Sequence, residues 1–145
     1  MNTPDAVASP STLLYKRVSF VLALLFGAAG LIFLVRPDWA VVGTNSICRP
    51  LGIQELQPYG FGFYQVLAVA YMAMVALLAF LMVLHPEEPI YPRLLICGKG
   101  TSSGLSLLML FVHGPYLLYG VNFAVDGSIA FLVYLLYRVR WRGTA

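Results

Sequence analysis

The chain has few charged side chains. Of its 145 residues, nine are Lys or Arg and six are Asp or Glu, so 10% are charged, whereas 60% are hydrophobic. A soluble domain carries about a quarter of its residues charged, so this composition excludes both a conventional soluble domain and a disordered chain. We expect the apolar surface to face lipid, and the positions of the few charges then indicate membrane topology.

Cysteine and histidine are also scarce, with two of each. Cys48 and Cys97 flank an apolar run of membrane-spanning length, so they lie too far apart to form a disulfide. His85 and His113 also lie at opposite ends of an apolar run, which prevents both from ligating one haem. No cluster of Cys, His and carboxylate residues has the spacing of a zinc site. We therefore expect no metal and no resident cofactor.

The sequence lacks a phosphate-binding loop as well. Residues 98–104, GKGTSSG, look like one at first. The Walker pattern requires a Gly five residues before the Lys and a Ser or Thr directly after it. Leu94 and Gly100 occupy those two positions, so the pattern fails twice.

Long apolar runs, in contrast, are abundant. A spanning helix needs about 20 predominantly apolar residues to cross the hydrocarbon core of a bilayer. We expect an all-α integral membrane four-helix bundle with a flexible tail over 1–14, a single transmembrane domain over 15–142 and an outer loop over 36–59. The expected helices cover about 18–35, 60–84, 94–119 and 122–140.

The point at which the third run folds back is open. His113, Gly114 and Pro115 form either a turn or a kink in a long third helix that ends near Gly120. We favour the kink, with Asn122 capping the fourth helix, because it leaves that helix at full length.

Basic residues are distributed unequally between the two sides of this bundle. Cytoplasmic loops of membrane proteins carry an excess of Lys and Arg, so we expect both termini in the cytoplasm. Arginines that directly follow a span meet anionic lipid head groups, so no nucleic-acid partner is expected. Only Arg36 and Arg49 lie on the outer side, and the inner side holds Lys16, Arg17, Arg93, Lys99, Arg138, Arg140 and Arg142.

Small residues in the third run predict close helix packing. They allow helix backbones to approach each other in lipid, where hydrophobic burial cannot drive association. At helical spacing they form two faces, one with Gly100 and Gly104 and one with Gly98, Ser102 and Ser106. The alternative is that these residues line a groove for a ligand.

Two charges, Lys99 and Asp126, lie inside apolar runs, where ionisable residues are costly and are candidates for function. Side chains lean toward the N-terminus of their helix, which directs these two in opposite directions along the bundle. We therefore expect Lys99 to snorkel to the cytoplasmic boundary and Asp126 to interact with the dipole of the last helix. In the alternative, they belong to a polar intramembrane site that holds a quinone-like head group or relays protons. Its candidate residues are Lys99, Asp126, Ser102, Ser103 and His113, with further hydroxyls at Thr101, Ser106 and Ser128.

The arrangement resembles the DoxX-like group of small bacterial membrane proteins with four transmembrane helices. The likeness extends over residues 15–138. It depends on a glycine-containing first helix that ends in Arg36-Pro37-Asp38-Trp39, on the segment 93–103 that opens the third helix, and on Asp126. The resemblance implies a bacterial inner membrane location. For some members of the group it also implies a role as a membrane subunit in quinone-linked oxidation of sulfur compounds.

Packing signals are abundant in this sequence, and catalytic constellations are missing. We expect a non-catalytic accessory or scaffold subunit of a membrane complex, such as a quinone-linked redox complex, rather than an enzyme. Its expected partners are the lipid bilayer and either other membrane subunits or a second copy of the chain. The alternative is a membrane protein or enzyme that binds a quinone or lipid at an intrabundle polar site.

Overall fold

The computed structural model describes residues 10–53, 55, 62–112 and 116–141. Within them the structure is all-helical. Its five helices are α1 (Pro10–Val35), α2 (Asp38–Leu51), α3 (Gly62–Leu84), α4 (Ile90–Val112) and α5 (Leu117–Trp141). All but α2 are long and apolar enough to cross a membrane, which confirms the expected all-α class with four helices of spanning length.

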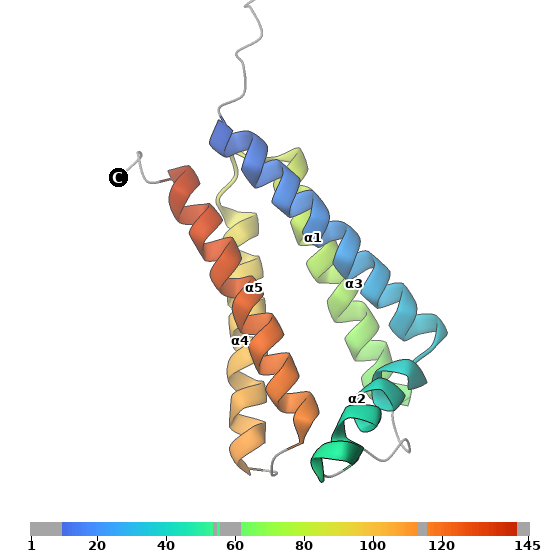
Figure 1. Cartoon of the computed structure of the whole chain (residues 1–145). Helices are drawn as coiled ribbons and strands as arrows, with labels where there is room; N and C mark the ends of the chain where they lie inside the picture. Colours follow the sequence, from blue (N-terminus) through green and yellow to red (C-terminus); the bar gives the residue numbers. More distant parts are fainter. Residues whose placement is uncertain (1–9, 54, 56–61, 113–115, 142–145) are drawn as a thin grey trace, which may run out of the picture.

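The four long helices form two antiparallel pairs. Helix α1 packs along α3, and α4 packs along α5, while α3 and α4 join the pairs (Figure 1). The pairs lie close together at the end that holds the start of α1 and the end of α5. They diverge toward the other end, where α2 lies across the bundle and contacts α1 and α5 (Figure 1).

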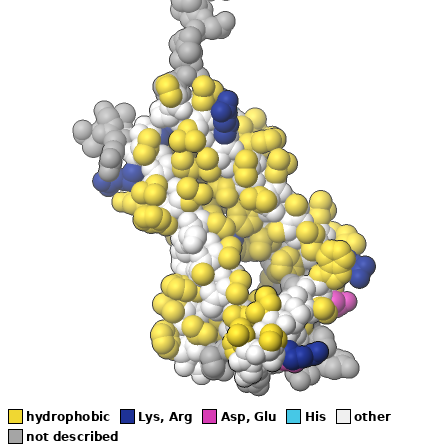
Figure 2. Space-filling view, in the orientation of Figure 1, with side chains coloured by type: hydrophobic (Ala, Val, Ile, Leu, Met, Phe, Trp, Pro, Cys, Tyr) yellow, Lys and Arg dark blue, Asp and Glu magenta, His cyan; other side chains and the backbone are white. Residues whose placement is uncertain are grey.

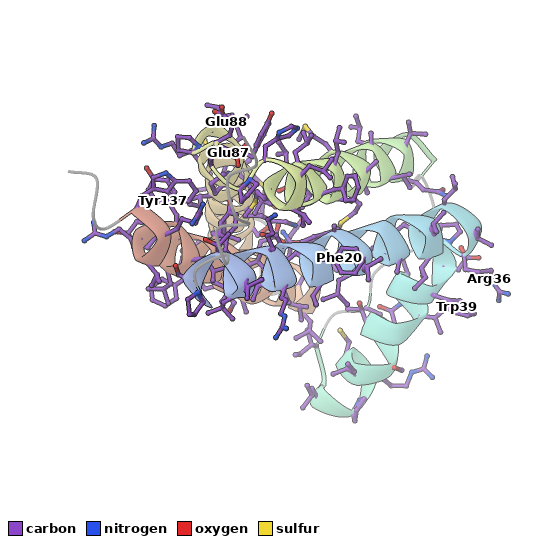
Figure 3. The ribbon with its side chains drawn as sticks, turned by 90° about the horizontal axis from the view of Figure 1, so that it is seen from above. Phe20, Arg36, Trp39, Glu87, Glu88 and Tyr137 are labelled. Carbon is purple, nitrogen blue, oxygen red and sulfur yellow. The ribbon has the colours of Figure 1, made fainter. Side chains whose placement is uncertain are left out.

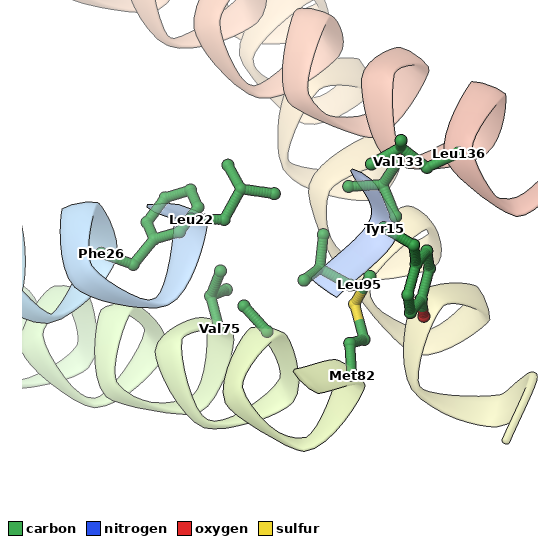
Figure 4. Packing of buried hydrophobic residues seen from close by; sticks show 9 residues of the cluster. Tyr15, Leu22, Phe26, Val75, Met82, Leu95, Val133 and Leu136 are labelled. Atoms are coloured by element: carbon green, nitrogen blue, oxygen red, sulfur yellow. The ribbon is translucent and has the colours of Figure 1, made fainter. Parts of the chain in front are cut away.

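A narrow stripe on each long helix supplies the core. Buried residues recur every three or four positions, as expected for helices with one face toward their neighbours. The side chains of Tyr15, Met82 and Leu95 lie together between the two pairs, and Phe26 lies further along α1 beside Leu22 (Figure 4). The full core cluster comprises Tyr15, Leu22, Phe26, Val75, Ala79, Met82, Leu95, Val133 and Leu136.

Most of the other apolar side chains point outward. Leu24, Leu31 and Phe111 are each more than half exposed, as are many other Leu and Val side chains of the long helices. Apolar side chains cover most of the molecular face in Figure 2, with Lys and Arg confined to its two ends. Such a surface is far larger than the apolar patches that soluble monomers expose.

Helix α1 begins earlier than expected, at Pro10 instead of Val18. Proline is well suited to the first turn of a helix, because its missing N–H has no intrahelical partner there. Arg140 also fixes this turn, since it donates hydrogen bonds to Thr12 Oγ1 (2.6 Å) and to the Pro86 carbonyl (3.0 Å). The expected tail therefore includes five helical residues, 10–14, and residues 1–9 lie outside the described part.

The segment expected as an outer loop contains α2. Gly43 and Pro50 lie inside this helix, and Gly52 ends it. Gly52 adopts a left-handed conformation (φ 64°), and its backbone N–H bonds back to the last turn.

The structure also corrects the preferred position of the fold-back. Helix α4 ends at Val112 and α5 starts at Leu117, so the chain turns between them instead of continuing to Gly120. Asn122 consequently lies inside α5 and does not cap it. Residues 113–115 themselves lie outside the described part of the chain.

Candidate functional site

The two charges inside the apolar runs form a buried ion pair. Lys99 Nζ lies 2.7 Å from Asp126 Oδ1, with side chains 0% and 4% exposed. Lys99 is the tenth residue of α4 and Asp126 the tenth residue of α5, so both lie well inside their helices. The expectations that Lys99 snorkels and that Asp126 acts at the start of its helix are therefore wrong.

The reason is energetic. An ammonium with no exposed surface is very costly unless it is paired, and this cost outweighs the usual lean of a helical side chain. The long Lys99 side chain can bridge the offset between the two helices. Pairing removes the net charge from the interior of the bundle.

Aromatic rings from the other helix pair complete the surroundings of Lys99. Its Nζ lies 4.2 Å from the ring centroid of Phe26 on α1 and 4.9 Å from that of Tyr71 on α3. Both distances are in the range of cation–π attraction, which is stronger when the cation is desolvated. Lys99 therefore contacts residues from each of the other three long helices and joins the two pairs.

A set of hydrogen bonds extends from this centre along the α4–α5 interface. Asn122 Nδ2 donates to Ser106 Oγ (2.6 Å) and to Ser102 Oγ (3.3 Å). Directly after Ser102 on α4, Ser103 donates a hydrogen bond from its Oγ to the Phe123 carbonyl (2.9 Å). These bonds hold α4 and α5 in one register, because each of them crosses between the two helices.

Tyr71 of α3 places a phenol hydroxyl close to the Lys99–Asp126 pair. Its hydroxyl is close to the negative charge of Asp126 and within hydrogen-bonding reach of the Ser102 hydroxyl. The Tyr71 oxygen is buried, and among the described residues it makes no hydrogen bond of regular geometry, with Ser102 as its nearest polar neighbour. Buried hydroxyls usually have a partner, so this donor beside the ion pair is able to bind a polar group of another molecule.

The candidate residues from the sequence divide into two groups. Lys99, Asp126, Ser102 and Ser103 lie together at the α4–α5 interface, and Ser106 extends the set through Asn122. Thr101 and Ser128 are exposed, and Ser128 Oγ bonds to the Ala124 carbonyl of its own helix, so they do not continue a polar path. His113 lies outside the described residues.

The two small-residue faces of α4 point in different directions. Gly98, Ser102 and Ser106 face the bundle, where a side chain added at Gly98 would approach the Tyr71 hydroxyl. Gly100 and Gly104 are exposed, and a Cβ added at either would meet no atom within 4 Å. Only the first face packs within this chain.

Sequence reasoning missed Phe26, Tyr71 and the role of Asn122. Phe26 and Tyr71 look like ordinary apolar positions, and only the packing of distant helices brings them to Lys99. For Asn122 a signal was present, because a polar amide within an apolar run needs partners.

The fold and the site together define a helical bundle with four helices of spanning length around a buried Lys–Asp pair. No protein-family model, curated protein or solved structure matches the chain.

Proposed function

We propose that the protein is a multi-pass protein of the bacterial inner membrane, with both termini in the cytoplasm. The exposed apolar surface of the four long helices supports insertion. The distribution of basic residues supports the orientation. Lys99 no longer counts toward the cytoplasmic side, because it is buried and paired with Asp126. Among the described basic residues, Arg36 and Arg49 lie at the α2 end of the bundle, whereas Lys16, Arg17, Arg93, Arg138 and Arg140 lie at the opposite end.

Within the membrane, the chain acts as a non-catalytic accessory or scaffold subunit. The observation that carries this proposal is the exposed face of Gly100 and Gly104 on α4. Small residues four positions apart allow a second helix to approach closely in lipid, and none of the five described helices packs on that face. The partner is a helix of another subunit or of a second copy.

Replacing Gly100 and Gly104 together by Leu is expected to abolish association without unfolding the bundle. The added side chains project into open space within the chain but prevent close approach of a partner helix. Native purification in mild detergent measures the effect, as loss of co-purifying protein or of the dimer.

The matched control is Ala28→Leu, which enlarges another small, exposed position on α1. We expect this variant to assemble as the unaltered protein does. A solitary monomer before any substitution would contradict the subunit proposal.

A second candidate function follows from the Tyr71 hydroxyl. This buried donor lies near Asp126 and has only the Ser102 hydroxyl as a polar neighbour among the described residues, so it suits the carbonyl of a quinone or the polar head of a lipid. Mass spectrometry of organic extracts from the purified protein tests it. A stoichiometric lipophilic ligand that is lost in Tyr71→Phe supports binding at this hydroxyl, whereas a ligand retained equally by both proteins, or absent from both, contradicts it.

A further inference from the structure

Helix α2 presents an apolar face that none of the other described helices covers. Trp39, Val42, Ile47 and Leu51 are 53–63% exposed. At about 100° per residue they fall within about half of the helix circumference. Cys48, on the opposite side, is 1% exposed and faces the bundle. Helix α2 is therefore fixed on one side and apolar on its free side.

Two polar side chains on this face and at its edge are paired, and Asp38, in the first turn of α2, is exposed. Ser46 Oγ donates to the Gly43 carbonyl (2.7 Å), so its hydroxyl is satisfied within the helix. At the edge, Arg49 forms an exposed ion pair with Glu55 (3.1 Å). The Ser46 hydroxyl therefore does not require a hydrogen bond to water, and the charges of Arg49 and Glu55 cancel.

The apolar face of α2 also continues the exposed surface of α1. Leu31 and Val35, in the last two turns of α1, are 63% and 70% exposed, and Trp39 follows Val35 four residues later, at the start of α2. The Arg36 guanidinium lies 4.9 Å from the Trp39 ring centroid. Both residues lie where α1 passes into α2, and α2 extends beyond the side of the long helices (Figure 3). Tryptophan and arginine at the end of a span are typical of the membrane interface.

We propose that α2 is an interfacial helix whose apolar face, formed by Trp39, Val42, Ile47 and Leu51, binds the lipid bilayer surface at the outer leaflet. This inference depends on the membrane insertion proposed above. Continuity with the lipid-facing side of α1 selects lipid as the occupant over a protein. Because Arg49 is paired with Glu55, apolar burial drives binding and anionic lipids are not required.

Tryptophan fluorescence tests this placement directly. The chain has two Trp, so Trp141→Phe leaves Trp39 as the single emitter. The variant is reconstituted into phosphatidylcholine vesicles that contain lipids brominated at shallow or at deep acyl positions. We expect blue-shifted emission, stronger quenching by the shallow bromines than by the deep ones, and weak quenching by aqueous iodide.

Two further variants, both in the Trp141→Phe background, separate apolar burial from charge. Val42→Glu with Ile47→Glu is expected to shift the emission to the red and to expose Trp39 to iodide. Arg49→Gln, the control, is expected to leave both signals unchanged. If Trp39 is quenched by iodide and not by lipid, α2 faces water and the inference is wrong.

Protection of Trp39 from both quenchers would overturn the inference in favour of a protein interface. Carbonate extraction of the same vesicles separates this failure from failure of the proposed function. A protein that resists extraction while Trp39 remains in water spans the membrane without an interfacial α2. A protein that is extracted does not span the membrane at all.

Discussion

Replacing Lys99 by Met alone is expected to lower the free energy of unfolding by about 3–5 kcal/mol, because it leaves the Asp126 carboxylate buried without its partner. Asp126→Leu alone should cost a similar amount for the same reason. The double variant, Lys99→Met with Asp126→Leu, removes both charges and is expected to regain most of the loss. Unfolding by SDS in mixed micelles, followed by circular dichroism, gives the three values.

The informative quantity is the difference between the loss of stability in the double variant and the sum of the two single losses. Residues in one ion pair show a coupling energy, whereas independent residues give losses that add. Arg17→Gln is the control, since Arg17 is an exposed charge near the start of α1. If the double variant loses the sum of the two single losses, the pair does not hold the bundle together.

Gly127→Ala is expected to destabilise the bundle by about 1–3 kcal/mol, although alanine favours helix more than glycine does. A Cβ at Gly127 would lie 2.9 Å from Ser103 Oγ, which is fixed by its hydrogen bond to the Phe123 carbonyl. The clash separates α4 from α5 next to Asp126. The same unfolding assay measures the loss.

A second background makes this prediction specific. Ser103→Ala removes the clashing oxygen, and the next atom of residue 103 lies 3.8 Å from the added Cβ. In that background Gly127→Ala should instead stabilise the helix, as Gly120→Ala should in the unaltered chain, where nothing lies within 4 Å. Equal effects of Gly127→Ala in both backgrounds would show that α4 and α5 do not approach closely here.

The number and approximate extent of the spanning helices could be predicted from the sequence, because hydrocarbon thickness sets a length that apolar runs either meet or miss. The position of the last turn could not be predicted. Gly114 and Pro115 break a helix, but Gly120 and Asn122 offered a second boundary with equally good local chemistry. In the structure Asn122 instead bonds to Ser102 and Ser106 of α4, and such contacts between helices are not visible in the local sequence.

The residues of the candidate site were visible as outliers, but their contact was not. Lys99 and Asp126 stand out because charges are rare in this chain. Their mutual orientation was judged from the average lean of helical side chains, which fails where burial of a charge dominates the energy. Helix α2 was missed because a short amphipathic period is hard to distinguish from a loop when glycine and proline interrupt it.

The central claim is that Lys99 and Asp126 contact each other inside the bundle in a lipid bilayer. Solid-state NMR tests it, and the chain offers a simple background because it has only two lysines, Lys16 and Lys99. In a Lys16→Arg variant with nitrogen-15 lysine and carbon-13 aspartate, the single ammonium signal should show strong dipolar coupling to a carboxylate carbon. Such coupling corresponds to the 2.7 Å contact between Nζ and Oδ1. An uncoupled ammonium that exchanges rapidly with water would contradict the account.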